Sequence, residues 1–165
     1  MHLSRSVKRL LSVVALGLAC SGCASTNAVP HPFPGSPIQR HAQPDGGTVI
    51  EHALRFLGTP YVDGGDTPAG FDCSGFTRYV FGLAHVALPR QAQEQFRQGK
   101  KQALRRVRPG DLIFFSTIAP GASHVGVVVD RTRFIHAPAT SGVVRIESFE
   151  TPYWKHRLVG VRRVR

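Results

Sequence analysis

The clearest helical pattern lies in the middle of the chain. Apolar side chains recur there at i, i+3, i+4 and i+7 and predict a helix over residues 73–83: Phe76, Tyr79, Val80 and Leu83. A second helix is predicted from Thr48, a suitable N-cap residue, to a stop at Gly58, because apolar residues gather on one side of this segment. A shorter helix is predicted over residues 90–98, after a proline.

The pattern changes to strand chemistry after Pro109-Gly110. Short runs of β-branched and aromatic residues follow, separated by turn residues: Leu112–Phe115, His124–Val129, Arg133–Ala137, Val143–Glu147 and Leu158–Val164. Helices followed by strands predict an α+β fold, with the helices packed on an antiparallel sheet of about five strands. We expect Phe76, Val80 and Leu83 of the helix to pack on Ile113, Phe115 and valines of the second strand.

The N-terminal part predicts an exported protein with three segments. Basic residues precede an apolar run over residues 10–19, and small residues follow, which is the layout of a secretory signal over residues 1–22. The run is shorter than the roughly 20 residues that span a bilayer. Residues 23–47 contain five prolines and predict a flexible tether, and residues 48–165 form the globular domain.

The end of this leader resembles a bacterial lipoprotein signal, in which a cysteine after small residues receives lipid. Cys23 is the predicted lipidation site, Cys20 is the alternative, and cleavage without lipid is a third possibility. With lipid, the protein is expected in the periplasm, held at the outer membrane through its N-terminus.

The charge of the chain favours an anionic polymer or surface as its partner. The net charge is +11, and removal of residues 1–22, which carry three basic residues and no acid, leaves +8. The chain has no nucleic-acid recognition motif, and most of its basic residues are scattered. We therefore expect no nucleic-acid partner, and we treat the chain as a monomer.

Cys73 is the candidate nucleophile. It follows a loop rich in glycine and proline and stands in the first turn of the predicted helix, with Asp72 as the N-cap residue. The free N–H groups and the dipole of a helix N-terminus favour a thiolate. A lone cysteine is most often a small buried hydrophobic residue. If cleavage falls before Cys23 and Cys23 receives lipid, however, Cys73 is the only free thiol, in an oxidising compartment, which favours a chemical role.

His124 and His136 are the candidate partners of Cys73. If residues 130–132 form a three-residue hairpin loop, Gly126 pairs with His136 and both histidines fall on one face as diagonal neighbours. A nucleophilic cysteine needs such a base, and the base needs a group that orients it. A zinc site is the other interpretation of Cys/His/His, but no close CxxC or HxxxH spacing links Cys73, His124 and His136, so we predict neither metal nor cofactor.

A set of short motifs resembles the NlpC family of bacterial cell-wall cysteine endopeptidases. They occur in order, from residue 58 onward: Gly58-Thr59-Pro60-Tyr61, Phe71-Asp72-Cys73-Ser74-Gly75-Phe76, Leu88-Pro89-Arg90, Pro109-Gly110-Asp111-Leu112, Ser123-His124-Val125-Gly126 and Phe134-Ile135-His136-Ala137. The resemblance implies a papain-like fold, with Cys73 as nucleophile, His124 as its base and His136 as the third polar residue. It also implies that Tyr61 borders the site as a candidate oxyanion contact.

The same resemblance implies a reaction and a substrate. Asp72 and Ser74 would help to bind a murein stem peptide, and a Cys73 thiolate paired with a His124 imidazolium would attack a peptide bond in the stem or in the cross-link. Asp63 departs from the family, in which this position is often aromatic. The alternatives are an amidase or acyltransferase with the same residues, and a lipid-anchored protein that binds murein without catalysis.

Overall fold

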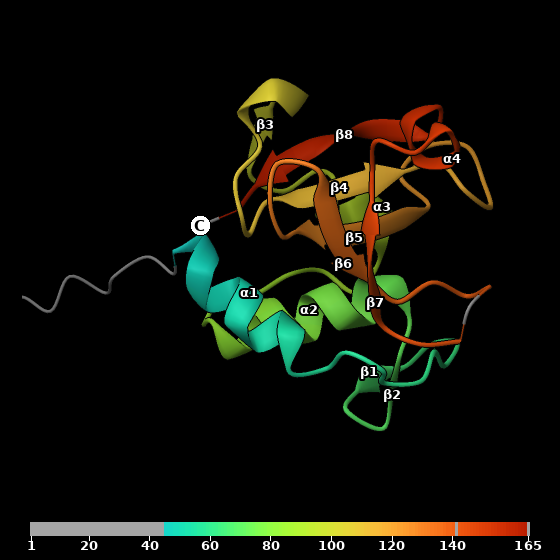
Figure 1. The fold of residues 1–165 in the computed structure, drawn as a ribbon. Coiled ribbons are helices and arrows are strands. Elements are labelled where there is room, and N and C mark those ends of the chain that lie inside the picture. The colour runs from blue at the N-terminus through green and yellow to red at the C-terminus, as the bar shows by residue number, and fades with distance from the viewer. Residues whose placement is uncertain (1–44, 141, 165) are drawn as a thin grey trace, which may run out of the picture. The chain divides into compact units, whose positions relative to one another are not determined.

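The structure is a computed structural model, and it describes residues 45–140 and 142–164 (Figure 1). The predicted leader, Cys20 and Cys23 lie outside these residues. The helices are α1 (Gly46–Leu54), α2 (Cys73–Leu83), α3 (Ala92–Gln95), α4 (Pro152–Lys155) and the 3₁₀ turn η1 (Leu104–Arg106). Within the described ranges, none of these helices has the length and apolar character needed to cross a membrane.

An antiparallel sheet of six strands forms the centre of the domain, in the order β3-β8-β4-β5-β6-β7. Its strands are β3 (Lys100–Gln102), β4 (Leu112–Phe115), β5 (His124–Val128), β6 (Arg133–His136), β7 (Arg145–Ser148) and β8 (Leu158–Arg163). A separate hairpin joins β1 (Asp66–Thr67) to β2 (Gly70–Phe71). The α+β fold with an antiparallel sheet is therefore confirmed. The sixth strand, β3, is a short polar edge strand that the hydrophobic pattern did not reveal.

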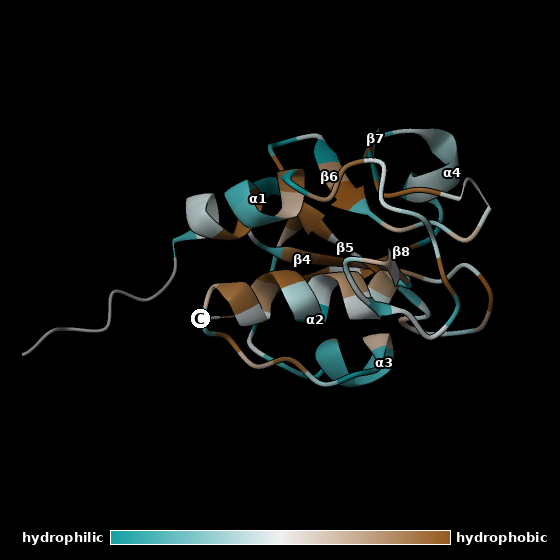
Figure 2. Cartoon of the chain, turned by 90° about the horizontal axis from the view of Figure 1, so that it is seen from below, coloured by the Kyte–Doolittle hydropathy of each residue, from teal (hydrophilic) through white to brown (hydrophobic). Residues whose placement is uncertain are grey.

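Hydrophobic packing covers both faces of the sheet. Figure 1 shows α1 and α2 on one side and α4 on the other, and Figure 2 shows hydrophobic residues concentrated in the central strands and along α2. The α2 side buries residues that include Phe76, Val80, Leu112, Phe114, Val125 and Val127. The opposite side buries residues that include Ile113, Phe115, Val128, Phe134, Trp154 and Val161.

The expected packing of α2 is therefore wrong in part. Phe76 and Val80 are buried as expected, but Leu83 is 40% exposed. Leu112 and Phe114 of β4 face α2, whereas Ile113 and Phe115 belong to the other layer. All four residues of β4 are buried, so the strand has no polar alternation from which its two faces could be distinguished.

The first helix begins earlier than expected. The Asp45 carboxylate accepts hydrogen bonds from the N–H of Thr48 at 2.9 Å and from its hydroxyl at 2.8 Å, so Asp45 is the N-cap residue and Thr48 lies inside α1. The helix ends at Leu54, and Gly58, with φ +82°, closes the turn that follows. Gly46 and Gly47, expected in the tether, belong to α1.

The other differences concern short segments. Helix α3 spans only Ala92–Gln95 of the predicted 90–98. Strand β7 starts at Arg145 and extends to Ser148, and α4 was not predicted. Each of these segments has too few residues to give a recognisable hydrophobic period.

A buried ion pair fastens β4 to β8. Asp111 is 1% exposed, and its carboxylate accepts hydrogen bonds from the Arg163 guanidinium at 2.7 and 2.8 Å and from the backbone N–H of Arg108 at 2.9 Å. Removing one partner of such a pair leaves a charge without compensation. The aspartate of the Pro109-Gly110-Asp111-Leu112 motif is therefore structural.

Asp111→Asn is expected to lower the free energy of unfolding by about 3 kcal/mol, because it leaves Arg163 unpaired beside a buried amide. Urea denaturation measures this change. Asp66→Asn is the matched control, since Asp66 forms an exposed pair with Arg78 at 3.0 Å, and its loss should cost less than about 1 kcal/mol. Equal losses in the two variants would contradict the structural role of Asp111.

Candidate active site

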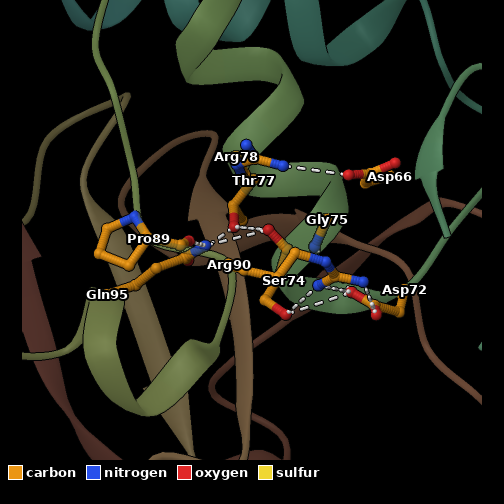
Figure 3. Close-up of polar contacts among 9 residues, drawn as sticks. All are labelled: Asp66, Asp72, Ser74, Gly75, Thr77, Arg78, Pro89, Arg90 and Gln95. Carbon is orange, nitrogen blue, oxygen red and sulfur yellow. Dashed lines mark hydrogen bonds and ion pairs between the residues drawn. The ribbon is translucent and has the colours of Figure 1, made fainter. Parts of the chain in front are cut away.

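The N-terminus of α2 is built around Asp72, as its sequence context predicted. The Asp72 carboxylate caps the helix by accepting from the Gly75 N–H at 2.7 Å, and it accepts from the Ser74 hydroxyl at 3.2 Å. Arg90 donates to both oxygens of Asp72, at 3.1 and 2.5 Å, and to Ser74 Oγ at 3.0 Å (Figure 3). Burial acts to raise the pKa of Asp72, but the contacts with Arg90 and Gly75 hold it below its ordinary value.

A second set of hydrogen bonds at the start of α2 is centred on Gln95. The fully buried Gln95 amide donates to the carbonyl oxygens of Ser74 at 3.0 Å and Pro89 at 2.9 Å, and it accepts from the Thr77 hydroxyl at 2.7 Å (Figure 3). These bonds tie the first turn of α2 to the Leu88-Pro89-Arg90 segment. The motifs around Cys73 and Arg90 are therefore joined in space by polar contacts.

Cys73 lies in a groove of about 750 Å³ at this end of α2. The groove brings together four of the predicted site residues, namely Tyr61, Asp72, Cys73 and Ser74, and its other lining residues include Asp63, Arg90, Ile118 and Ser123. Burial, followed by the charge of Asp63, raises the pKa of Tyr61, so its hydroxyl stays protonated.

The resting state of Cys73 differs from the expected thiolate. Burial raises the pKa of the thiol above its ordinary value, although the backbone N–H groups of Val125, Ser74 and Cys73 act to lower it. The helix N-terminus thus supplies the expected donors, but desolvation outweighs them.

The two predicted histidines form a buried pair that does not line this groove: their rings contact Phe115, Phe134 and Trp154, which belong to the layer opposite α2. The β5–β6 register, Val127 with Ile135 and Val128 with Phe134, is the one that a three-residue loop at 130–132 requires. As expected, His124 and His136 share one face, and Nε2 of His124 lies 2.8 Å from Nδ1 of His136. Their exposed fractions are 7% and 0%. The Trp154 ring stacks on His124, with 5.5 Å between the ring centroids.

Both rings of the pair are uncharged at neutral pH. Burial, reinforced by the neighbouring His136, lowers the pKa of His124 to about 3, and burial lowers the pKa of His136 as well. The resting site therefore holds a protonated thiol and neutral imidazoles, in place of the expected thiolate–imidazolium pair. A thiol and a neutral imidazole are residue types suited to proton transfer during attack on a substrate.

Glu147 is a polar residue of the site that the sequence did not single out. Its Oε2 lies 3.7 Å from Nε2 of His136 and accepts from the Trp154 indole N–H at 2.5 Å, and Arg145 pairs with its other oxygen. The neighbouring His136 lowers the pKa of Glu147 to about 2. Only the β6–β7 register could have revealed Glu147, and the long connection between these strands leaves that register open in the sequence.

The buried histidines predict a protein that loses stability in mild acid. Unfolded His124 takes up a proton near pH 6.5, whereas folded His124 does so only near pH 3, so the stabilisation is complete above pH 6.5. Below pH 6.5 it falls by about 1.4 kcal/mol per pH unit for each such histidine. Urea denaturation at pH 7 and 5 measures this slope.

His124→Gln should reduce the slope, whereas His156→Gln, at an exposed position, should retain it. Equal slopes in the two variants would contradict the assignment. The Glu147 contribution lies at lower pH, because it is present above pH 4.5 and is lost only as the pH falls toward 2.

No group of three or more His, Cys, Asp or Glu side chains within residues 45–140 and 142–164 is arranged to hold a metal ion.

Comparisons with known proteins identify the family of the chain. The NlpC/P60 family model matches residues 58–163. A gamma-DL-glutamyl hydrolase of Bacillus subtilis is 43% identical over 118 residues, which are 70% of this chain and 28% of that protein. A probable endopeptidase of Haemophilus influenzae is 40% identical over 132 residues, which are 79% of this chain and 78% of that protein.

The fold is similar to that of a solved NlpC/P60 family protein from Bacillus cereus. The TM-score is 0.68 at 32% sequence identity, and the match covers 73% of this chain and 40% of that one. The family match spans the segments that build the Cys73 groove and the histidine pair. The chain therefore belongs to the NlpC/P60 family.

Proposed function

We propose that the chain is a peptidoglycan endopeptidase that cleaves peptide bonds of murein stem peptides or cross-links, with Cys73 as its nucleophile. The observation that carries this proposal is the position of Cys73, at the N-terminus of α2 and in a groove that Tyr61, Asp72 and Ser74 also line. The relatives support the substrate class, since one is named a gamma-DL-glutamyl hydrolase and another a probable endopeptidase.

The reaction begins from neutral groups. As the Cys73 sulfur attacks the carbonyl carbon, the thiol proton passes to His124, and the bound substrate replaces the water around the groove. The amine leaves with that proton and an acyl-enzyme remains, and water then hydrolyses the thioester with His124 as the base. This sequence needs no thiolate in the resting site, in accordance with the raised pKa of Cys73 and the lowered pKa of His124.

The oxyanion is stabilised by donors at the end of the helix. The Cys73 backbone N–H and the protonated Tyr61 hydroxyl are the proposed donors, and one such contact contributes about 3 kcal/mol in the transition state. Ser74 and Asp72 form the binding surface for the stem peptide. Arg90 holds both residues in place, so that this surface is already ordered before the substrate arrives.

Digestion of purified murein tests the function, with the products identified by mass spectrometry. Cleavage of the D-glutamyl–diaminopimelate bond releases a diaminopimelate-bearing peptide, and cleavage of the cross-link converts dimeric muropeptides to monomers. Either product supports the proposal. Release of a free stem peptide from the glycan would instead identify an amidase, and unchanged murein would identify a binding protein.

We also propose that the protein acts outside the cytoplasm, held at the outer membrane by lipid on Cys23. The basic, apolar and small-residue order of residues 1–25 supports this location. The mass of the mature N-terminus distinguishes lipid on Cys23, lipid on Cys20 and an unmodified end.

A further inference from the structure

A line of polar groups runs inward from His124 and ends at a carboxylate. Nε2 of His124 lies 2.8 Å from Nδ1 of His136, and Nε2 of His136 lies 3.7 Å from Oε2 of Glu147. The second distance is longer than a hydrogen bond but within the range of an ion pair. The His136 ring is fully buried, and its Nε2 makes no hydrogen bond with any described residue. Two charged groups lie beside it: Glu147, and Arg145, which pairs with Glu147 and whose charge acts on the pKa of His136 in the opposite direction.

A neutral imidazole pair can place its two protons in two ways. In the first arrangement, Nε2–H of His136 points at Glu147, its bare Nδ1 accepts from Nε2–H of His124, and Nδ1 of His124 is bare. In the second, Nδ1–H of His136 donates to a bare Nε2 of His124, and Nδ1 of His124 carries the other proton. Only the first leaves Nδ1 of His124 free to accept a proton.

Glu147 separates these arrangements electrostatically. The second arrangement aims a nitrogen lone pair of the fully buried His136 at an ionised carboxylate, and the low dielectric around a buried group strengthens this repulsion. The first arrangement aims an N–H at the same oxygen, so the carboxylate stabilises it.

We propose that Glu147 is a positioning residue that, through His136, keeps Nδ1 of His124 unprotonated and available as the base for Cys73. This inference rests on the proposed function for its chemical meaning. The effect on the protons of the two rings, however, follows from the contacts of Glu147 alone.

Two further contacts hold Glu147 in this position. The Trp154 indole N–H donates to Oε2, the oxygen nearest His136, and Arg145 pairs with Oε1. The same indole ring stacks on His124. Trp154 therefore fixes the carboxylate at one end of the line and the imidazole at the other.

The test compares wild type with Glu147→Gln, which keeps the shape of the side chain and removes its charge. Nitrogen NMR of histidine-labelled protein identifies the protonated nitrogen of each ring. We expect bare Nδ1 and protonated Nε2 on His124 in wild type, and a substantial population of the opposite tautomer in Glu147→Gln. Turnover of a soluble muropeptide should fall about tenfold to 100-fold in kcat, with little change in KM.

Two variants complete the test. Glu150→Gln removes an exposed carboxylate three residues away, and it should keep the wild-type tautomers and kcat. Glu147→Asp retains the charge and should keep the wild-type tautomer of His124, and it provides the measurement if Glu147→Gln does not fold. Wild-type tautomers in Glu147→Gln, or a changed tautomer in Glu147→Asp, would overturn the inference.

The outcome is separable from that of the proposed function. If murein remains uncut by wild type while the His124 tautomer still depends on Glu147, the endopeptidase proposal fails and the positioning role stands. If murein is cut by wild type and the tautomers do not respond to Glu147→Gln, the positioning role of Glu147 fails and the endopeptidase proposal stands.

Discussion

Replacing Cys73 by alanine is expected to reduce the hydrolysis of murein by a factor on the order of 10⁴ or more, because the variant lacks the thiol that is proposed to form the acyl intermediate. The proton acceptor and the oxyanion donors remain, but without a nucleophile they act only on water. Cys73→Ser should not restore activity, since a hydroxyl loses its proton far less readily than a thiol to a neutral imidazole. Muropeptide analysis by mass spectrometry measures the products.

Gly82→Ala is the matched control for this prediction. It changes the same helix at a position where a Cβ atom meets nothing within 4 Å, so its turnover should equal that of wild type. Thermal unfolding should show that Cys73→Ala remains folded. The same products from wild type and Cys73→Ala would exclude Cys73 as the nucleophile.

Gly126→Ala should be the most damaging single methyl addition near the histidine pair. A Cβ atom at this position would lie 2.6 Å from Cδ2 of Phe134, 2.8 Å from the Ile135 carbonyl oxygen and 3.1 Å from Cβ of His136. The backbone oxygen belongs to the paired strand and cannot move without opening the β5–β6 ladder. We expect a loss of about 1–3 kcal/mol in the free energy of unfolding and a fall in kcat, because His136 is displaced from His124.

Urea denaturation and murein digestion measure the two parts of this prediction. Gly82→Ala again serves as the control, because alanine in an open helical position stabilises by about 0.5–1 kcal/mol. Wild-type stability of Gly126→Ala would contradict the prediction, because it would show that β5 and β6 move apart near His136 at little cost in the free energy of unfolding. If Gly126→Ala is destabilised but keeps wild-type turnover, the added methyl group disturbs the packing of the strands without displacing His136 from His124.

Sequence patterns that fix a local geometry correctly predicted the α+β fold and the shared face of His124 and His136. The Asp130-Arg131-Thr132 loop fixes the register of a hairpin, so the shared face of His124 and His136 followed from counting residues. Asp72 as N-cap and the start of α2 followed from the change between loop and helical periodicity. These features depend on neighbours in sequence, which a pattern can describe.

Features that depend on contacts between residues far apart in the sequence were predicted poorly. Leu112–Phe115 is apolar throughout, so its two faces became distinct only once α2 and α4 had packed on opposite sides. The protonation state of Cys73 depends on how deeply the thiol is buried, whereas the sequence reveals only its place at a helix N-terminus. Glu147 reaches His136 across a connection whose length sets no register, so the sequence pattern could not connect the two residues.

The partial burial of Cys73 also affects how quickly its sulfur would be oxidised while no substrate occupies the groove. Oxidation by peroxide to sulfenic acid proceeds through the thiolate and requires access to the sulfur. A thiol that remains protonated within the protein reacts slowly with such oxidants, even in an oxidising compartment. If Cys73 is the nucleophile as proposed, the desolvation that keeps its thiol protonated would therefore also protect the sulfur chemically between turnovers.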